Sequence, residues 1–159
     1  MKRLFPLLLL LSGCGLQPLY AGGGSGAVAG TLGQVEVPAI EGRAGWLMAN
    51  ALRDRLGESS GPRYRLDVRL DDQITGLGIR RDDAVTRERR TLRARYQLVD
   101  LSNGSVVLDA TAGSDAGIDV VGSEYATIAA ENTALERLSG IVADEIVARL
   151  ALYARRQAQ

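Results

Sequence analysis

RYRLDVRLDDQI, residues 63–74, is the stretch that decides the fold of this chain, and RTLRARYQLVDL, residues 90–101, repeats its pattern. In both stretches apolar side chains alternate with charged or polar ones. Successive side chains of a strand point to opposite faces of a sheet, so this period of two predicts two strands with one apolar face each. The apolar faces, which we expect in the core, carry Tyr64, Leu66, Val68, Leu70, Leu92, Ala94, Tyr96 and Leu98.

The opposite faces of the same two strands are polar. They carry Arg65, Asp67, Arg69, Arg93, Arg95 and Gln97. If the strands are neighbours, these side chains form an arginine-rich surface on a rigid sheet. Residues 76–88, which are rich in glycine and charge, are expected to form the connection between the two strands.

A hairpin turn and a third strand follow directly. Asn103-Gly104 is a hairpin signal, because both residues tolerate positive φ angles. The third strand covers residues 105–111, SVVLDAT, and its extension through residues 117–120 is left open.

Other elements flank these strands. Residues 32–40 alternate as a strand does, and Pro38 points to a sheet edge or to the strand's end. Residues 46–56, WLMANALRDRL, show helical spacing before Gly57, a suitable C-terminal stop. A long helix then starts at the N-cap Ser123. Its apolar positions, spaced by three, four or seven residues, are Ile128, Leu135, Leu138, Val142, Ile146, Leu150 and Tyr153.

These elements predict an α+β fold around one core. Their order is strand, helix, three strands, helix, and two helices on one face of the sheet bury the apolar faces most simply. We therefore expect a two-layer sandwich with a mostly antiparallel four-stranded sheet, formed as a single domain by residues 31–159. Its core is expected to include Leu66, Val68, Tyr96, Leu98, Leu135 and Val142.

The N-terminus has the features of a secretory signal. Residues 1–14, MKRLFPLLLLLSGC, contain two positive charges, an apolar run and two small residues before the single cysteine. The run is too short to span a bilayer, for which a helix needs about 20 residues. LSGC at residues 11–14 resembles the lipobox of bacterial lipoproteins, which predicts a signal peptide at residues 1–13 and lipidation of Cys14. Residues 14–30, which end in a Gly-rich run, would then form a tether.

Composition excludes several kinds of site. The chain has no histidine, and its one cysteine would carry lipid, so histidine-based triads and the preferred zinc ligands are missing. We expect no enzyme, no cofactor, no metal and no nucleic-acid partner. Every basic residue after Lys2 is an arginine. The planar, forked guanidinium binds phosphates and carboxylates in two-point geometry.

Several segments, taken in order after the lipobox, resemble a known family. They are CGLQPLY at residues 14–20, WLMANALRDRL at 46–56, RYRLDVRL at 63–70, LRARYQLVDLSNGSVVLDAT at 92–111 and SEYATIAAENTALERLSGIVADEIVARL at 123–150. Together they resemble LptE, the lipopolysaccharide-assembly lipoprotein, in its alphaproteobacterial form. The resemblance implies a two-layer α/β fold and a lipid anchor in the outer membrane. It also implies a domain that faces the periplasm or sits in the lumen of an LptD-like β-barrel, and a role in delivering lipopolysaccharide to the cell surface.

If lipopolysaccharide is a ligand, arginines are the candidates for contact with its lipid A phosphates. The candidate set is Arg65, Arg69, Arg87, Arg89, Arg90, Arg93 and Arg95. Several forked donors on a rigid sheet can hold phosphate through charge-assisted hydrogen bonds. The alternative is a solvated face whose charges pair with one another and contribute little.

Two function classes remain open from the sequence. One is a non-enzymatic assembly factor that plugs a barrel, since a polar sheet face suits a hydrophilic lumen. The other is a lipoprotein regulator of a periplasmic cell-wall enzyme, which a Gly-rich tether also suits. An enzyme without histidine, free cysteine or a mature-chain lysine would depend on a carboxylate pair or a lone arginine, and we do not expect one.

Overall fold

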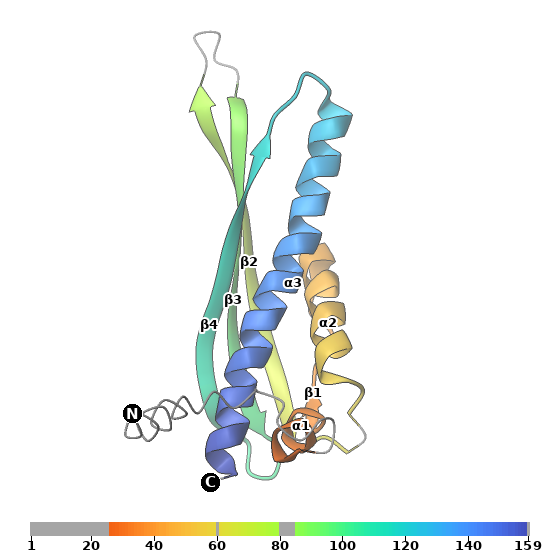
Figure 1. Cartoon of the computed structure of the whole chain (residues 1–159), viewed down its shortest axis with the longest axis vertical. Helices are drawn as coiled ribbons and strands as arrows, with labels where there is room; N and C mark the ends of the chain where they lie inside the picture. The colour runs from red at the N-terminus through yellow and green to blue at the C-terminus, as the bar shows by residue number, and fades with distance from the viewer. Residues whose placement is uncertain (1–25, 60, 80–84, 159) are drawn as a thin grey trace, which may run out of the picture.

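The fold is a long four-stranded sheet with helices on one face, as Figure 1 shows. The computed structural model describes residues 26–59, 61–79 and 85–158. The expected two-layer α+β architecture is confirmed. The elements in chain order are α1 (Ala27–Leu32), β1 (Val35–Glu36), α2 (Gly42–Leu56), β2 (Tyr64–Ile79), β3 (Val85–Asp100), β4 (Ser105–Asp119) and α3 (Glu124–Gln157).

The strands follow one another across the sheet in the order β1-β2-β3-β4. The β2–β3 and β3–β4 pairs are antiparallel, whereas the short β1 lies parallel to β2. The sheet is therefore mixed, and its antiparallel pairs dominate, as expected. Because β1 pairs only with Tyr64 and Arg65, the rest of β2 has no strand beside its outer edge in the part of the chain that the structure describes.

The β2–β3 hairpin is longer than the sequence pattern predicts. Each of its strands has 16 residues. The ladder still pairs Leu77 with Arg87, so the connection expected over residues 76–88 is wrong at both ends. Its residues 80–84 lie outside the described residues. The ladder continues because antiparallel pairing uses backbone groups, which glycine and charged residues supply as well as apolar ones do.

The N-terminal part differs in two ways from the expectation. Of the strand expected over residues 32–40, only Val35 and Glu36 pair as β1. Pro38 has no N–H group to donate, so the ladder cannot continue through it. Residues 27–30, expected in the tether, belong to α1, which packs against α3. A helix this short is unstable alone, so its formation depends on tertiary contacts that no local pattern reveals.

The structure also defines the start of α2, the end of β4 and both ends of α3. α2 begins at Gly42 rather than at Trp46. β4 continues to Asp119, so the third strand does extend beyond residue 111. α3 has 34 residues and begins after Ser123, whose side chain accepts a hydrogen bond from the backbone N–H of Ala126, as an N-cap should.

The core lies between the sheet and the pair α2 and α3. Its strand residues include Tyr64, Leu66, Leu92, Ala94, Tyr96 and Leu98, and its helix residues include Met48, Leu52, Leu135, Leu138, Val142, Ile146 and Leu150. Val68 and Leu70, expected in the core, are only partly buried. Ile128 is 47% exposed. Figure 1 accounts for the exposure of Ile128: α2 lies beside the middle of α3, so the N-terminal turns of α3 extend beyond it.

A charged clamp, formed by Arg90 with Asp72 and the backbone of Glu131, fastens the sheet to α3 beside the core residues Ala116 and Ile118. Arg90 shares the inner face of β3 with Leu92, and it is buried. Its Nε donates to Asp72 Oδ1 at 2.8 Å, and its Nη1 donates to the backbone carbonyl of Glu131 at 2.8 Å. The hydrogen bond to Asp72 raises the pKa of Arg90 above its ordinary value. Arg90 therefore joins β2, β3 and α3 through a single side chain.

The clamp predicts a measurable loss of stability. Arg90→Gln removes charged hydrogen bonds and leaves a partly buried carboxylate and a carbonyl without their donor, so we expect unfolding free energy to fall by about 1–3 kcal/mol. Arg87→Gln is the matched control, because Arg87 pairs with Asp119 in an exposed position. That change should cost about 0–1 kcal/mol. Chemical denaturation of both variants measures these losses. Equal decreases in unfolding free energy would show that Arg90 does not hold the sheet and α3 together.

Candidate functional site

The outer face of the sheet, turned away from the helices, is the candidate site. Alternation sends the odd-numbered residues of β2 and β3 to this face. Of the candidate arginines, the outer face holds Arg65, Arg69, Arg87, Arg89, Arg93 and Arg95, whereas Arg90 lies on the inner face in the clamp. Arg90 is an even-numbered residue of β3, as are the buried Leu92, Ala94 and Tyr96. The alternation along the strand could therefore have placed Arg90 on the inner face from the sequence alone.

Register sets which charges are neighbours on the outer face. Asp67 lies opposite Gln97, and Asp71 lies opposite Arg93. Between these two rows, Arg69 lies directly opposite Arg95. Like charges directly opposite each other destabilise a sheet. The structure therefore concentrates positive charge at this row.

Two of the outer-face arginines are held by carboxylates in two-point geometry. Arg65 donates to both oxygens of Asp67, at 2.9 and 3.0 Å. Arg95 donates to both oxygens of Asp109 on β4, at 3.3 and 3.0 Å, and Gln97 also donates to Asp109. The bond from Arg95 lowers the pKa of Asp109, and the bond to Asp109 raises the pKa of Arg95. These charges are already compensated.

Near the start of β3, two more arginines face acids at the end of β4. Arg87 Nε lies 3.0 Å from Asp119 Oδ1, and Arg89 Nε lies 3.8 Å from Asp115 Oδ2. Both pairs are exposed, so they contribute little stability. Four outer-face arginines therefore pair with acids of the same chain. They are Arg65, Arg87, Arg89 and Arg95.

Arg69 and Arg93 differ from the rest. Both side chains are exposed, and neither makes an ion pair or a side-chain hydrogen bond with another residue that the structure describes. The stem of Arg93 lies across Gly113 of β4, where an added Cβ would sit 3.2 Å from Arg93 Cγ. Gly113 thus makes room for Arg93, a role the sequence pattern did not reveal. Arg69 and Arg93 are the donors on this face that remain available to an external anion.

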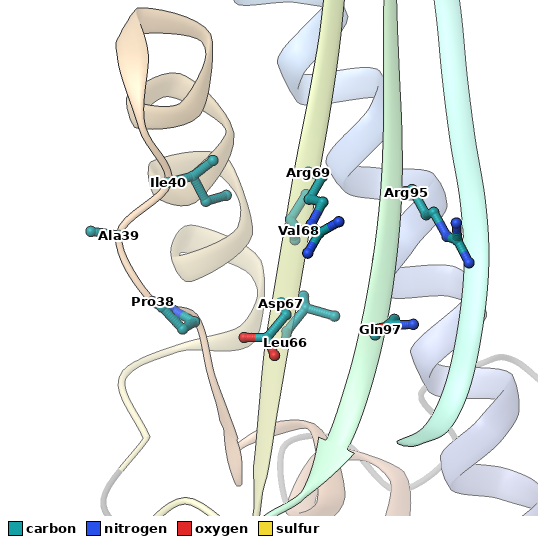
Figure 2. A pocket seen from close by; sticks show the side chains of 9 residues that line it. All are labelled: Pro38, Ala39, Ile40, Leu66, Asp67, Val68, Arg69, Arg95 and Gln97. Atoms are coloured by element: carbon teal, nitrogen blue, oxygen red, sulfur yellow. The ribbon is translucent and has the colours of Figure 1, made fainter. Parts of the chain in front are cut away.

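Two shallow hollows adjoin these arginines. The first, of about 480 Å³, lies between β2 and the segment that follows β1, as Figure 2 shows. It is lined by Pro38, Ala39, Ile40, Leu66, Asp67, Val68, Arg69, Arg95 and Gln97. The second, also of about 480 Å³, includes Arg69, Arg93 and Gly113 among its lining residues. Arg69 and Arg95 line both hollows, so these two arginines can be reached from either hollow.

The segment 38–40 that walls the first hollow is fixed by α2. A Cβ added at Gly45 would lie 2.5 Å from the carbonyl oxygen of Ile40, so only glycine allows this close approach. Arg53 of α2 also donates to the carbonyl of Val37 at 3.0 Å. The hollow therefore has one wall held by a helix and another formed by the sheet.

This arrangement suits anion binding. Guanidinium groups that are free of carboxylates can donate two hydrogen bonds to one phosphate. No group of histidine, cysteine and acidic side chains that could hold a metal occurs among residues 26–59, 61–79 and 85–158. Within the same residues, no helix is long and apolar enough to cross a membrane.

Three solved structures with similar folds are described as lipoproteins. A candidate lipoprotein from Caulobacter crescentus CB15 is 26% identical, with a TM-score of 0.71 over 82% of this chain and 98% of that one. Rare lipoprotein B from Shewanella oneidensis is 9% identical, with a TM-score of 0.62 over 79% and 98% of the two chains. A minor lipoprotein from Acinetobacter baumannii is 14% identical, with a TM-score of 0.57 over 75% and 89%. The last two likenesses concern the fold alone.

Sequence comparisons identify the family of the chain. A search of curated protein sequences gives no significant match. The family model described as "LptE: Lipopolysaccharide-assembly", by contrast, matches residues 32–150, which run from the end of α1 to the penultimate turns of α3. The match covers most of the chain and confirms the family resemblance of its segments. The chain therefore belongs to the LptE lipopolysaccharide-assembly family.

Proposed function

We propose that this chain is an outer-membrane lipoprotein that plugs an LptD-like β-barrel and helps to assemble it. In that role the chain acts without catalysis in the transport of lipopolysaccharide to the cell surface, and its outer sheet face contacts the lipid A phosphates. Membership of the LptE family supports the general role. The shape and charge of the domain support the barrel and the phosphate contact.

The observation that carries the barrel proposal is the long, ion-paired outer face. Strands of 16 residues span roughly 50 Å at about 3.3 Å per residue. α3, with 34 residues, has a similar length at about 1.5 Å per residue. A narrow rod with a polar flank fits the interior of a large outer-membrane barrel, because such barrels are lined with polar side chains. Compensated pairs such as Arg95–Asp109 tolerate enclosure better than single charges do.

The phosphate contact is proposed at the uncompensated arginines of the same face. Lipid A presents phosphate groups, and charge-assisted bonds to phosphate are about twice as strong as neutral ones. Arg69 and Arg93 lack intramolecular partners among the described residues, so binding would not first have to break an ion pair. The remaining arginines of the original candidate set serve the structure of the sheet in this proposal.

The anchor is proposed at Cys14, in a stretch outside the described residues. The LSGC sequence supports it, as does the family. In this proposal residues 1–13 are removed as a signal peptide, the residues from Cys14 to the start of α1 tether the chain, and α1 with the residues after it forms one domain. The lipid holds the domain at the outer membrane, beside or inside its barrel.

The anchor gives the first test. Mass spectrometry of the membrane-extracted protein should show an acylated N-terminus at Cys14. Cys14→Ala should abolish acylation and leave a soluble or an uncleaved form of the protein, because the acyl chains that anchor it are then missing. An unmodified N-terminus at another residue would refute the anchor.

The barrel partner is tested by copurification. A C-terminal tag on the acylated protein should bring down an outer-membrane β-barrel from detergent-solubilised membranes. Reversing the paired charges of the outer face, as in the double change Arg95→Asp and Asp109→Arg, keeps the pair but alters the face. This variant should fold normally and recover less barrel. Recovery of a peptidoglycan synthase in place of a barrel would favour the alternative role, regulation of a cell-wall enzyme.

Lipopolysaccharide binding is tested with the two unpaired arginines. Arg69→Gln combined with Arg93→Gln should weaken binding by about 1.5–3 kcal/mol for each charged hydrogen bond that is removed, or roughly tenfold or more. Arg87→Gln combined with Arg89→Gln removes the same charge from paired positions and should change affinity little. The difference should shrink at high salt, since exposed charges are screened. Equal effects of the two double variants would reject Arg69 and Arg93 as the site.

A further inference from the structure

One end of the molecule gathers three parts of the chain: α1, the turn between β3 and β4, and the C-terminal turns of α3 (Figure 1). Contacts confirm the grouping, because α1 packs on α3 and the rings of Tyr64 and Tyr153 meet edge to face at 6.3 Å. Tyr64 in turn pairs with Asp100, the last residue of β3. We call this the basic end, for the residues that it exposes. They are Arg149, Leu152 and Arg156 of α3, with the half-buried Arg155 beside them and Leu101 and Val106 at the turn.

The arginines of the basic end are uncompensated. None of Arg149, Arg155 and Arg156 makes an ion pair or a side-chain hydrogen bond with another residue that the structure describes. Two of them lie in the last turn of α3, where positive charge complements the helix dipole. That explanation does not extend to Arg149, which lies further from the helix end. The helix dipole therefore explains two of the three arginines but not the whole cluster.

Apolar side chains stand between and beside these arginines. Leu152 is 46% exposed, and it lines a hollow of about 440 Å³ together with the three arginines. At the neighbouring turn Leu101 is 41% exposed and Val106 is 50% exposed. A leucine flanked by arginines matches the boundary between lipid headgroups and acyl chains.

The position of the anchor points to the same surface. Cys14 is about 12 residues before Gly26, where the described chain starts, so the link spans at most about 40 Å in any conformation. α1 follows Gly26 immediately and belongs to the basic end. A lipid at Cys14 therefore holds α1 and the basic end within about 40 Å of the membrane.

We propose that the basic end binds anionic phospholipid headgroups in the membrane leaflet that holds the anchor. The arginines contact the phosphates, and Leu152 with Leu101 enters the headgroup boundary. This inference rests on the proposed function for the lipid at Cys14. The contact places the basic end at the leaflet and leaves the β2–β3 hairpin at the opposite end of the rod.

The opposite end of α3 offers a built-in comparison. Val121, Tyr125 and Ile128 are exposed there, and Tyr125 at 85% is more exposed than any apolar residue of the basic end named here. The first turn of α3 carries an acid, Glu124, and no arginine. If exposed apolar area alone governed membrane contact, this end would bind; if the combination with arginine governs it, the basic end binds.

The experiment places a probe at each end of the full acylated chain. Because Cys14 carries lipid, the only free thiol is the one introduced by Leu152→Cys or, as the matched control on the same helix, by Tyr125→Cys. Each thiol receives an environment-sensitive fluorophore, and the protein is reconstituted in vesicles. The vesicles contain phosphatidylcholine alone or with phosphatidylglycerol, and a nitroxide-labelled lipid that quenches fluorescence at the surface.

We expect strong quenching at position 152, dependent on phosphatidylglycerol, and little at position 125. Changing Arg149, Arg155 and Arg156 to Gln should weaken the binding about fivefold for each arginine removed. Equal quenching at both positions, or quenching at 152 that ignores lipid charge and these arginines, would overturn the proposal. Loss of barrel copurification would instead refute the proposed function, and the vesicle measurement would still decide the membrane contact.

Discussion

The structure depends on the register of the β2–β3 hairpin. Leu66 lies opposite Leu98, and Arg69 opposite Arg95, in one continuous antiparallel ladder. A slip of one residue would move every side chain of a strand to the other face. It would place Leu98 in water and bring Arg95 under α3. Because the helices can pack only on an apolar surface, this register also decides where α2 and α3 lie.

The same register distributes the charges. β4 supplies Asp109, Asp115 and Asp119 to the outer face, and each compensates one arginine of β3. Gly113 interrupts this series and lies opposite Arg93, so no acid of β4 faces that arginine. Glu145 of α3 accepts a hydrogen bond from the backbone N–H of Gly113, and it makes no ion pair with Arg93 among the described residues. The polar face is therefore not uniform. It combines compensated pairs, which suit an enclosed polar surface, with two arginines that remain available for an external anion.

The rod has two different ends. At the basic end α1, the β3–β4 turn and α3 meet, and ring contacts such as Tyr64–Tyr153 fix them together. Towards the far end, polar contacts made by Arg90 and Asn132 join the sheet, α2 and α3 beside the buried Ala116 and Ile118. An anchored protein that must enter a partner would present this far end to it, with the basic end remaining at the lipid surface.

Local patterns in the sequence determined the elements that repeat with a clear period, whereas only the tertiary structure decided which arginines are free. The alternation around Leu66 and Leu98 was enough to predict strands and their buried faces, because the period is a property of the backbone. Asp109 and Asp72, by contrast, reach Arg95 and Arg90 from other strands. The ladder through residues 76–79 and the short helix α1 also escaped prediction, because backbone pairing and packing against α3 stabilise them. The sequence thus determined which faces exist, and the fold decided which charges on them are compensated, because compensation requires partners that only long-range pairing brings within hydrogen-bond distance.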